Sequence, residues 1–129
     1  MSHNTTETFG QWLTERCEYL KTLETEAEHA LHGEKNTDKY TNLMRKKALF
    51  LQGLVKEAQS LAATLPPQTA DLALCRLEQF SSNATRALEI GSIFFMSALL
   101  YPADHVKGQP NNLDLLAAEV LSLAGQEDV

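Results

Sequence analysis

Residues 44–65 read MRKKALFLQGLVKEAQSLAATL, and this stretch decides the fold class of the chain. Its apolar residues recur at alternating intervals of four and three: Met44, Ala48, Leu51, Val55, Ala58, Ala62 and Leu65. That spacing places them on one face of an α-helix and is typical of a coiled-coil seam packed against another helix. Pro66 and Pro67 end the helix, because proline lacks an amide donor and the residue before it disfavours helical geometry.

Two further stretches show helical spacing on either side of residues 44–65. The upstream stretch has an apolar row at seven-residue intervals: Leu13, Leu20 and Ala27. Acidic residues occupy much of its remaining surface: Glu15, Glu18, Glu24, Glu26 and Glu28. The downstream stretch alternates steps of three and four: Leu74, Leu77, Ser81, Ala84, Leu88, Gly91, Phe95 and Ala98. Short turns separate the three stretches, so consecutive helices are expected to run antiparallel.

These patterns predict an all-α fold in which residues 1–129 form a single helical-bundle domain. We expect an antiparallel bundle of three long helices with a short fourth C-terminal helix. The predicted helices span about 6–32, 38–65, 69–101 and 112–124.

The third predicted helix becomes apolar on almost every side after Ile90. Such a helix has to be covered by another part of the chain or by another protein. The fourth helix is the cover within the chain, and we expect it to act as a lid over the end of the third helix. The predicted partner-binding residues come from both helices: Phe94, Phe95, Leu99, Leu100, Leu113, Leu116 and Val120.

Charge and composition narrow the classes of partner. The formal net charge of −6 argues against binding to nucleic acid or to anionic membranes, since both repel an acidic surface. The concentrated basic run Arg45-Lys46-Lys47 fans out around a helix axis, so we expect it to be a solvated helix surface.

The sequence also bears on the compartment. Met1 to Glu7 lacks the basic segment and apolar run of a secretory signal, and the longest apolar stretch, Ile90 to Tyr101, is about half a membrane span. Cys17 and Cys75 show no disulfide-framework spacing, so we expect free thiols in a reducing compartment. We therefore predict a cytoplasmic protein without a membrane span.

Acidic and histidine residues near the end of the first predicted helix form a candidate metal site. Glu26-x-x-His29, with Glu28 and His32 nearby, matches one half of the motif that di-iron carboxylate bundles use twice. The second half is missing, and histidines near a helix C-terminus are favoured by the helix dipole alone. We therefore expect no metal site and no cofactor.

A second acidic pattern matches half of the magnesium motif of the all-α nucleotide pyrophosphohydrolases. Glu15-x-x-Glu18 supplies the first carboxylate pair, whereas Glu34 and Asp38 are one residue too far apart for the second. In the loop after the third helix, Asp104 and His105 have no accompanying nucleophile. We predict that the protein is not an enzyme and has no catalytic residues, and we keep the pyrophosphohydrolase as a minor alternative.

The first predicted hairpin carries a resemblance to a known family. Its first helix contains Leu20-x-x-Leu23-x-x-Glu26-x-x-x-Ala30-Leu31, and its second contains Lys46-Lys47-Ala48-Leu49-Phe50-Leu51-x-x-Leu54. This pattern resembles the FlgN-like flagellar type III export chaperones over residues 20–54, and more weakly over residues 74–100.

The resemblance implies a non-enzymatic role in the cytoplasm. A chaperone of this family binds helical segments of hook–filament junction proteins, the hook-associated proteins, and delivers them for secretion. The alternative from the residues alone is a structural bundle that forms a homodimer through the end of the third helix.

Overall fold

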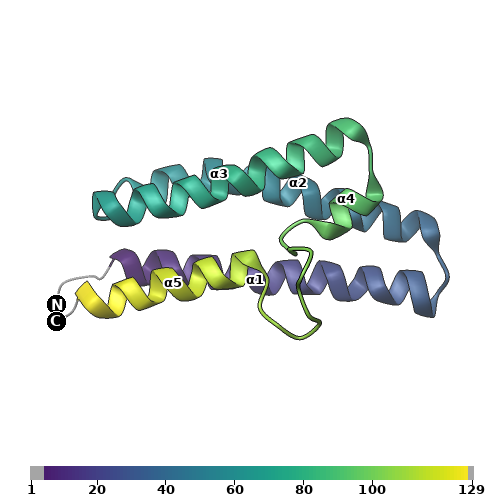
Figure 1. Ribbon diagram of the computed structural model, residues 1–129, viewed down its shortest axis with the longest axis horizontal. Helices are drawn as coiled ribbons and strands as arrows, with labels where there is room; N and C mark the ends of the chain where they lie inside the picture. Colours follow the sequence, from purple (N-terminus) through teal and green to yellow (C-terminus); the bar gives the residue numbers. More distant parts are fainter. Residues whose placement is uncertain (1–4, 128–129) are drawn as a thin grey trace.

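The computed structural model describes residues 5–127, and every regular element in that range is a helix (Figure 1). Residues 1–4, which belong to the segment tested for a secretory signal, and residues 128–129 lie outside the described range. The elements are α1 (Thr5–Glu28), η1 (His29–Gly33), α2 (Thr37–Ala62), α3 (Pro67–Ile90), α4 (Ile93–Ala98) and α5 (Asn112–Glu127). The predicted all-α class is confirmed.

The long helices pack as an up-down-up-down bundle. α1 and α2 form an antiparallel hairpin, α3 returns along α2, and α5 runs back along α1 (Figure 1). Beyond the start of α5, α1 and α2 continue together to the π-helical turn η1 that joins them (Figure 1). We call the part in which α5 packs on α1 the bundle half. The other part contains the α1–α2 turn and is covered by α4 and the loop after it, and we call it the hairpin half.

Local chemistry sets the helix ends. The Asn36 side chain accepts a hydrogen bond from the Lys39 amide at 3.1 Å and caps α2. α3 begins with Pro67 in its first turn, where the missing amide costs nothing. Gly91 ends α3 in a left-handed conformation with φ 73°, and its amide donates to the carbonyl of Ala87 at 2.9 Å.

The predicted continuous helix over residues 69–101 is wrong in its last third. The chain leaves the helix at Gly91 and restarts at Ile93, because the Ser92 side chain accepts the Phe95 amide at 3.1 Å and caps the short α4. The apolar row runs straight across this break, so its spacing alone does not reveal it.

The core follows the predicted apolar rows. Fully buried apolar side chains come from α1 to α5: Leu13, Leu20, Ala48, Leu51, Leu54, Ala58, Ala73, Leu77, Ala84, Met96, Leu113, Leu116 and Val120. Burial of these side chains supplies most of the favourable free energy of folding.

The position of α5 corrects the expected lid. α5 packs mainly along α1 and only secondarily along α3, so it does not cover the end of the third helix. Gly10 allows the close approach of α1 and α5, because an added Cβ would lie 2.6 Å from Cδ2 of Leu121. Leu113, Leu116 and Val120 are therefore core residues of the bundle and do not form a detachable lid.

None of the helices within residues 5–127 combines the length and the apolarity needed to cross a bilayer.

We predict that Leu51→Ala lowers the free energy of unfolding by about 2–5 kcal/mol, because it leaves a cavity in the core. Leu49→Ala is the matched control on the same helix, since Leu49 is 57% exposed, and it should change stability by less than about 0.5 kcal/mol. Urea unfolding measures both. Equal effects of the two changes would contradict the placement of α2.

Candidate functional site

The most exposed aromatic side chains lie on α4. Phe94 is 74% exposed and Phe95 is 49% exposed, and their ring centroids are 5.9 Å apart. Ile90, at the end of α3 just before the break, is 58% exposed. We call Ile90, Phe94 and Phe95 the α4 surface. Exposed apolar side chains gathered in this way mark protein-interaction sites more often than single ones do.

The other predicted partner-binding residues lie elsewhere. Leu99 and Leu100 are buried beside Met96, on the inner side of α4 and the chain that follows it. Leu113, Leu116 and Val120 are buried in the α1–α5 packing described above. The structure therefore leaves only Phe94 and Phe95, of the seven, on the surface.

A buried ion pair lies beneath α4. Lys47 of α2, which was expected to be solvated with Arg45 and Lys46, is 0% exposed. Its ammonium donates to Oε2 of Glu24 on α1 at 3.1 Å and to the carbonyl oxygen of Ser97 on α4 at 3.0 Å. Two helices and α4 thus meet at a single charged group.

Tyr101 completes this cluster. Its hydroxyl donates to Oε1 of Glu24 at 2.7 Å, and the Lys47 ammonium lies 5.0 Å from the centroid of its ring. The rings of Tyr101 and His105 form a T-shaped pair, with their centroids 4.8 Å apart. We call Glu24, Lys47 and Tyr101 the polar cluster.

Burial dominates the electrostatics of the polar cluster. It lowers the pKa of Lys47 below its usual value of 10.5, and the neighbouring Glu24 partly offsets that effect. It also raises the pKa of the Tyr101 hydroxyl, and the hydrogen bond to Glu24 acts in the same direction. Tyr101 therefore stays a neutral hydrogen-bond donor at physiological pH.

Asn111, at the start of α5, lowers the pKa of the Tyr101 hydroxyl against the larger effect of burial. It exchanges two hydrogen bonds with Asp114: the Asn111 amide donates to Oδ2 of Asp114 at 3.0 Å, and the Asp114 amide donates to Oδ1 of Asn111 at 2.9 Å. This reciprocal arrangement caps α5 in the manner of a capping box. Asp114 in turn lies 3.8 Å from the Lys21 ammonium on α1.

A hollow of about 760 Å³ opens beside the polar cluster, between α1, α2 and the loop after α4. Charges of both signs line it, including Lys21, Glu24, Glu28 and Lys107. His105 also borders it, with Nε2 2.9 Å from the carbonyl oxygen of Gln109. Because the charges are mixed, the hollow does not select an anion or a cation.

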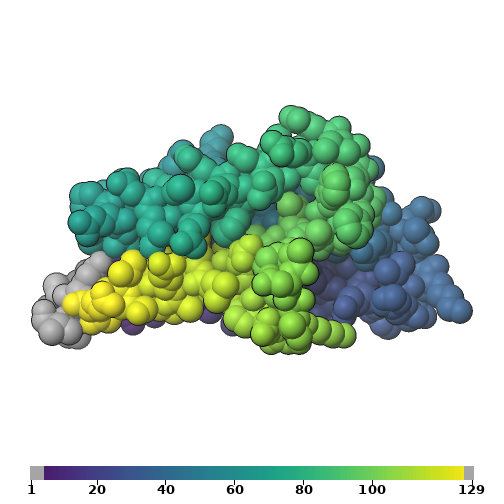
Figure 2. Space-filling view, viewed as in Figure 1, coloured from purple at the N-terminus to yellow at the C-terminus, as the bar shows by residue number. Residues whose placement is uncertain are grey.

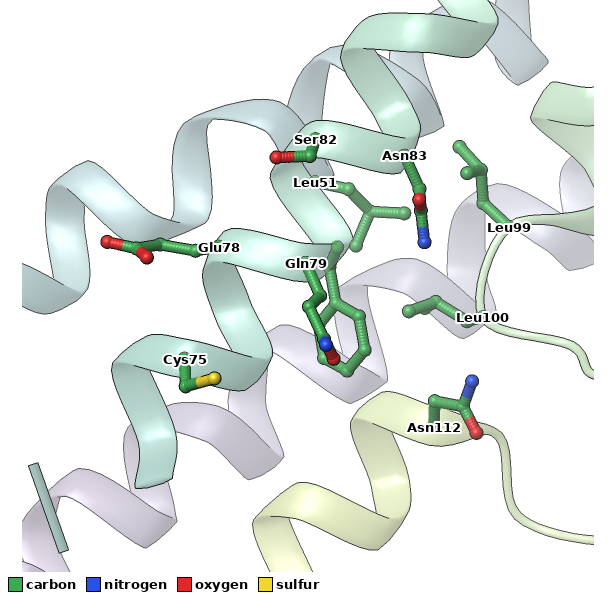
Figure 3. Close-up of a pocket in the computed structure, with 10 residues that line it drawn as sticks. Leu51, Cys75, Glu78, Gln79, Ser82, Asn83, Leu99, Leu100 and Asn112 are labelled. Carbon is green, nitrogen blue, oxygen red and sulfur yellow. The ribbon is translucent and has the colours of Figure 1, made fainter. Parts of the chain in front are cut away.

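A second hollow, of about 580 Å³, lies between α3 and the start of α5 (Figure 3). Asn83 of α3 and Asn112 of α5 point from opposite sides toward the space beside Leu100, whereas Glu78 and Ser82 point away from it (Figure 3). The space-filling view shows the same face hollowed where α3 meets α5 (Figure 2). Its walls are mainly amides and apolar side chains, together with Cys75, Glu78 and Ser82, and the hollow suits contact with protein.

The residues considered for catalysis and metal binding stay apart. Among residues 5–127, no three His, Cys, Asp or Glu side chains come close enough together to hold a metal ion. His29 instead lies 3.5 Å from Glu34 across the turn η1.

The polar cluster was not predicted, although the spacing of its charged residues indicates it. Lys47 follows Leu43 by four residues and precedes Leu51 by four, so it falls within the apolar stripe of α2. Glu24 likewise follows the buried Cys17 by one heptad on α1. Opposite charges at core positions of adjacent antiparallel helices indicate a buried pair.

Comparison with known proteins finds no matching family model, curated protein or solved structure.

The two cysteines give a direct test of the α1–α5 packing. Burial, with a hydrogen bond to Asp114, raises the pKa of Cys17 from 9.0 to about 12, whereas Cys75 is exposed. At pH 8 we expect a disulfide reagent to titrate one thiol per native chain and two per chain in urea, because a protonated buried thiol is a poor nucleophile.

Cys75→Ser is the control and should leave no rapidly reacting thiol in the native protein. Rapid reaction of two thiols per native wild-type chain would show that α5 does not protect Cys17.

Proposed function

We propose that this protein acts by binding another protein through the α4 surface, and not by catalysis. The observation that carries the proposal is the pair of adjacent exposed aromatic rings on a short helix whose inner side is fixed in the core. Aromatic side chains dominate the binding energy of many interfaces, because they bury a large apolar area with little loss of conformational freedom.

The kind of partner follows from the shape of the surface. Phe95 lines a hollow of about 290 Å³ together with Arg86, Ala98 and Pro102. An amphipathic helix can lay its apolar face against such a surface, with anchors spaced three or four residues apart. We therefore propose a helical segment as the ligand.

We further propose that the protein is a cytoplasmic flagellar export chaperone for hook–filament junction proteins. The support is the likeness of residues 20–54 to the FlgN-like family, and these residues form the α1–α2 hairpin. The residues that carry the likeness include Leu20, Leu51 and Leu54, all of which are buried. The likeness thus concerns how the hairpin packs, and the partner has to be identified by binding.

Homodimerisation through the α4 surface is the second candidate. An apolar surface of this kind can pair with a copy of itself around a two-fold axis. Light scattering of the wild-type protein and of Phe94→Ser separates the two: a dimer that becomes a monomer in the variant favours self-association.

The binding prediction uses purified full-length chain and the hook–filament junction proteins of the same organism. Phe94→Ser and Phe95→Ser should each weaken binding about tenfold or more, since each removes a buried aromatic contact from the interface. Leu115→Ser is the matched control, because Leu115 is 51% exposed on α5, and it should change affinity less than about twofold. Isothermal titration calorimetry gives the affinities.

Two results would count against these proposals. Absence of binding to every junction protein would refute the chaperone role. Binding that is unchanged in both phenylalanine variants would refute the α4 surface as the site.

A further inference from the structure

The segment between α3 and α5 differs from the rest of the fold in how it is held. We call residues 99–111 the strap, which with α4 covers the hairpin half and stands out beside the start of α5 (Figure 2). The long helices are held by continuous apolar rows, whereas the end of α4 and the start of the strap combine the buried Met96, Leu99 and Leu100 with hydrogen bonds to α1 and α2 through the polar cluster.

Both ends of this segment are places where the chain can turn. Gly91 has a left-handed φ of 73°, and a side chain added there would meet nothing within 4 Å. Toward the other end Gly108 has a left-handed φ of 94°, and a side chain added there would meet nothing within 4 Å; opening would also break the hydrogen bond from the Asn112 amide to the Leu100 carbonyl. Movement about these ends does not require any long helix to bend.

The observed position of the strap also contains backbone strain. Leu100 is buried and has a φ of 76°, a left-handed conformation that an L-residue other than glycine adopts at a cost. Strain of this kind persists only where the surrounding contacts impose it. The neighbouring Tyr101 supplies such a contact through its hydrogen bond to Glu24.

An ion pair with a buried lysine is well suited to fixing a position. The Lys47 ammonium is fully removed from water and the Glu24 side chain keeps 21% exposure, so the cost of dehydrating the ammonium offsets much of their attraction and the pair adds little net stability. The buried ammonium nevertheless requires specific oxygen partners, and this requirement excludes other positions of the helices that supply them. Lys47 meets that requirement with Glu24 and the carbonyl of Ser97, which leaves one position for α4.

We propose that Glu24, Lys47 and Tyr101 form a latch, and that residues 92–111 open as one unit when the latch is broken while the long helices stay folded. Opening would uncover Met96, Leu99 and Leu100 and would remove one wall of the hollow beside Asn83. The apolar area next to Phe94 and Phe95 would then increase. That increase matters for partner binding only if the proposed function is correct; the latch itself does not depend on it.

Hydrogen exchange followed by mass spectrometry tests the latch in the full chain without a partner. Tyr101→Phe removes only the hydroxyl that donates to Glu24, so the amides of residues 92–111 should exchange about tenfold faster. Peptides from α1, α2 and α3 should change less than about twofold. Tyr19→Phe is the matched control, because the Tyr19 ring packs on Phe50 and its hydroxyl makes no hydrogen bond within residues 5–127.

A second variant, Lys47→Met, removes the buried charge and should give the same local increase in exchange. If this variant does not fold, Tyr101→Phe alone decides the test. Unchanged exchange in residues 92–111, or an equal increase in every helix, would overturn the latch. Failure of the wild-type protein to bind a partner would refute the proposed function and leave the exchange result standing.

Discussion

The ammonium of Lys47 is the group on which the arrangement of the hairpin half depends. A charge that is fully removed from water requires oxygen partners at hydrogen-bond distance, and apolar packing cannot supply them. The carboxylate of Glu24 and the carbonyl of Ser97 meet this requirement, and the ring of Tyr101 adds a cation–π contact at 5.0 Å. Their positions fix α4, and α4 in turn holds Phe94 and Phe95 on the outside.

The two halves of the molecule are therefore stabilised in different ways. In the bundle half, apolar rows of α1, α2, α3 and α5 interlock, and stability comes from area removed from water. In the hairpin half α5 is absent, and a short helix and a strap, held by buried apolar side chains and by polar contacts, take its place beside α1 and α2. The exposed aromatic rings occur in this half, where regular packing ends and a surface is free to contact a partner.

The regular spacing of apolar residues was enough to predict the long helices. The heptad rows predicted α1, α2 and most of α3, because each row needs a packed face. They could not predict the break at Gly91, since the row continues from Leu88 to Phe95 across it. The spacing of α5 showed an apolar face but not its destination, which depends on the close approach that Gly10 permits. Phe94 and Phe95 were expected to lie under the fourth helix, whereas they are exposed. The burial of Lys47 was not predicted either, because lysine is seldom buried without a partner that lies far away in the sequence.

The central claim is that Glu24 and Lys47 act as a pair. A double-mutant cycle measures this directly, with urea unfolding of the wild type, Glu24→Gln, Lys47→Met and the double variant. Glu24→Gln alone leaves a buried ammonium without its counter-charge, whereas in the Lys47→Met background there is no such charge to leave. We expect Glu24→Gln to cost at least about 1 kcal/mol more in the wild type than in the Lys47→Met background. An equal cost in the two backgrounds would contradict the claim.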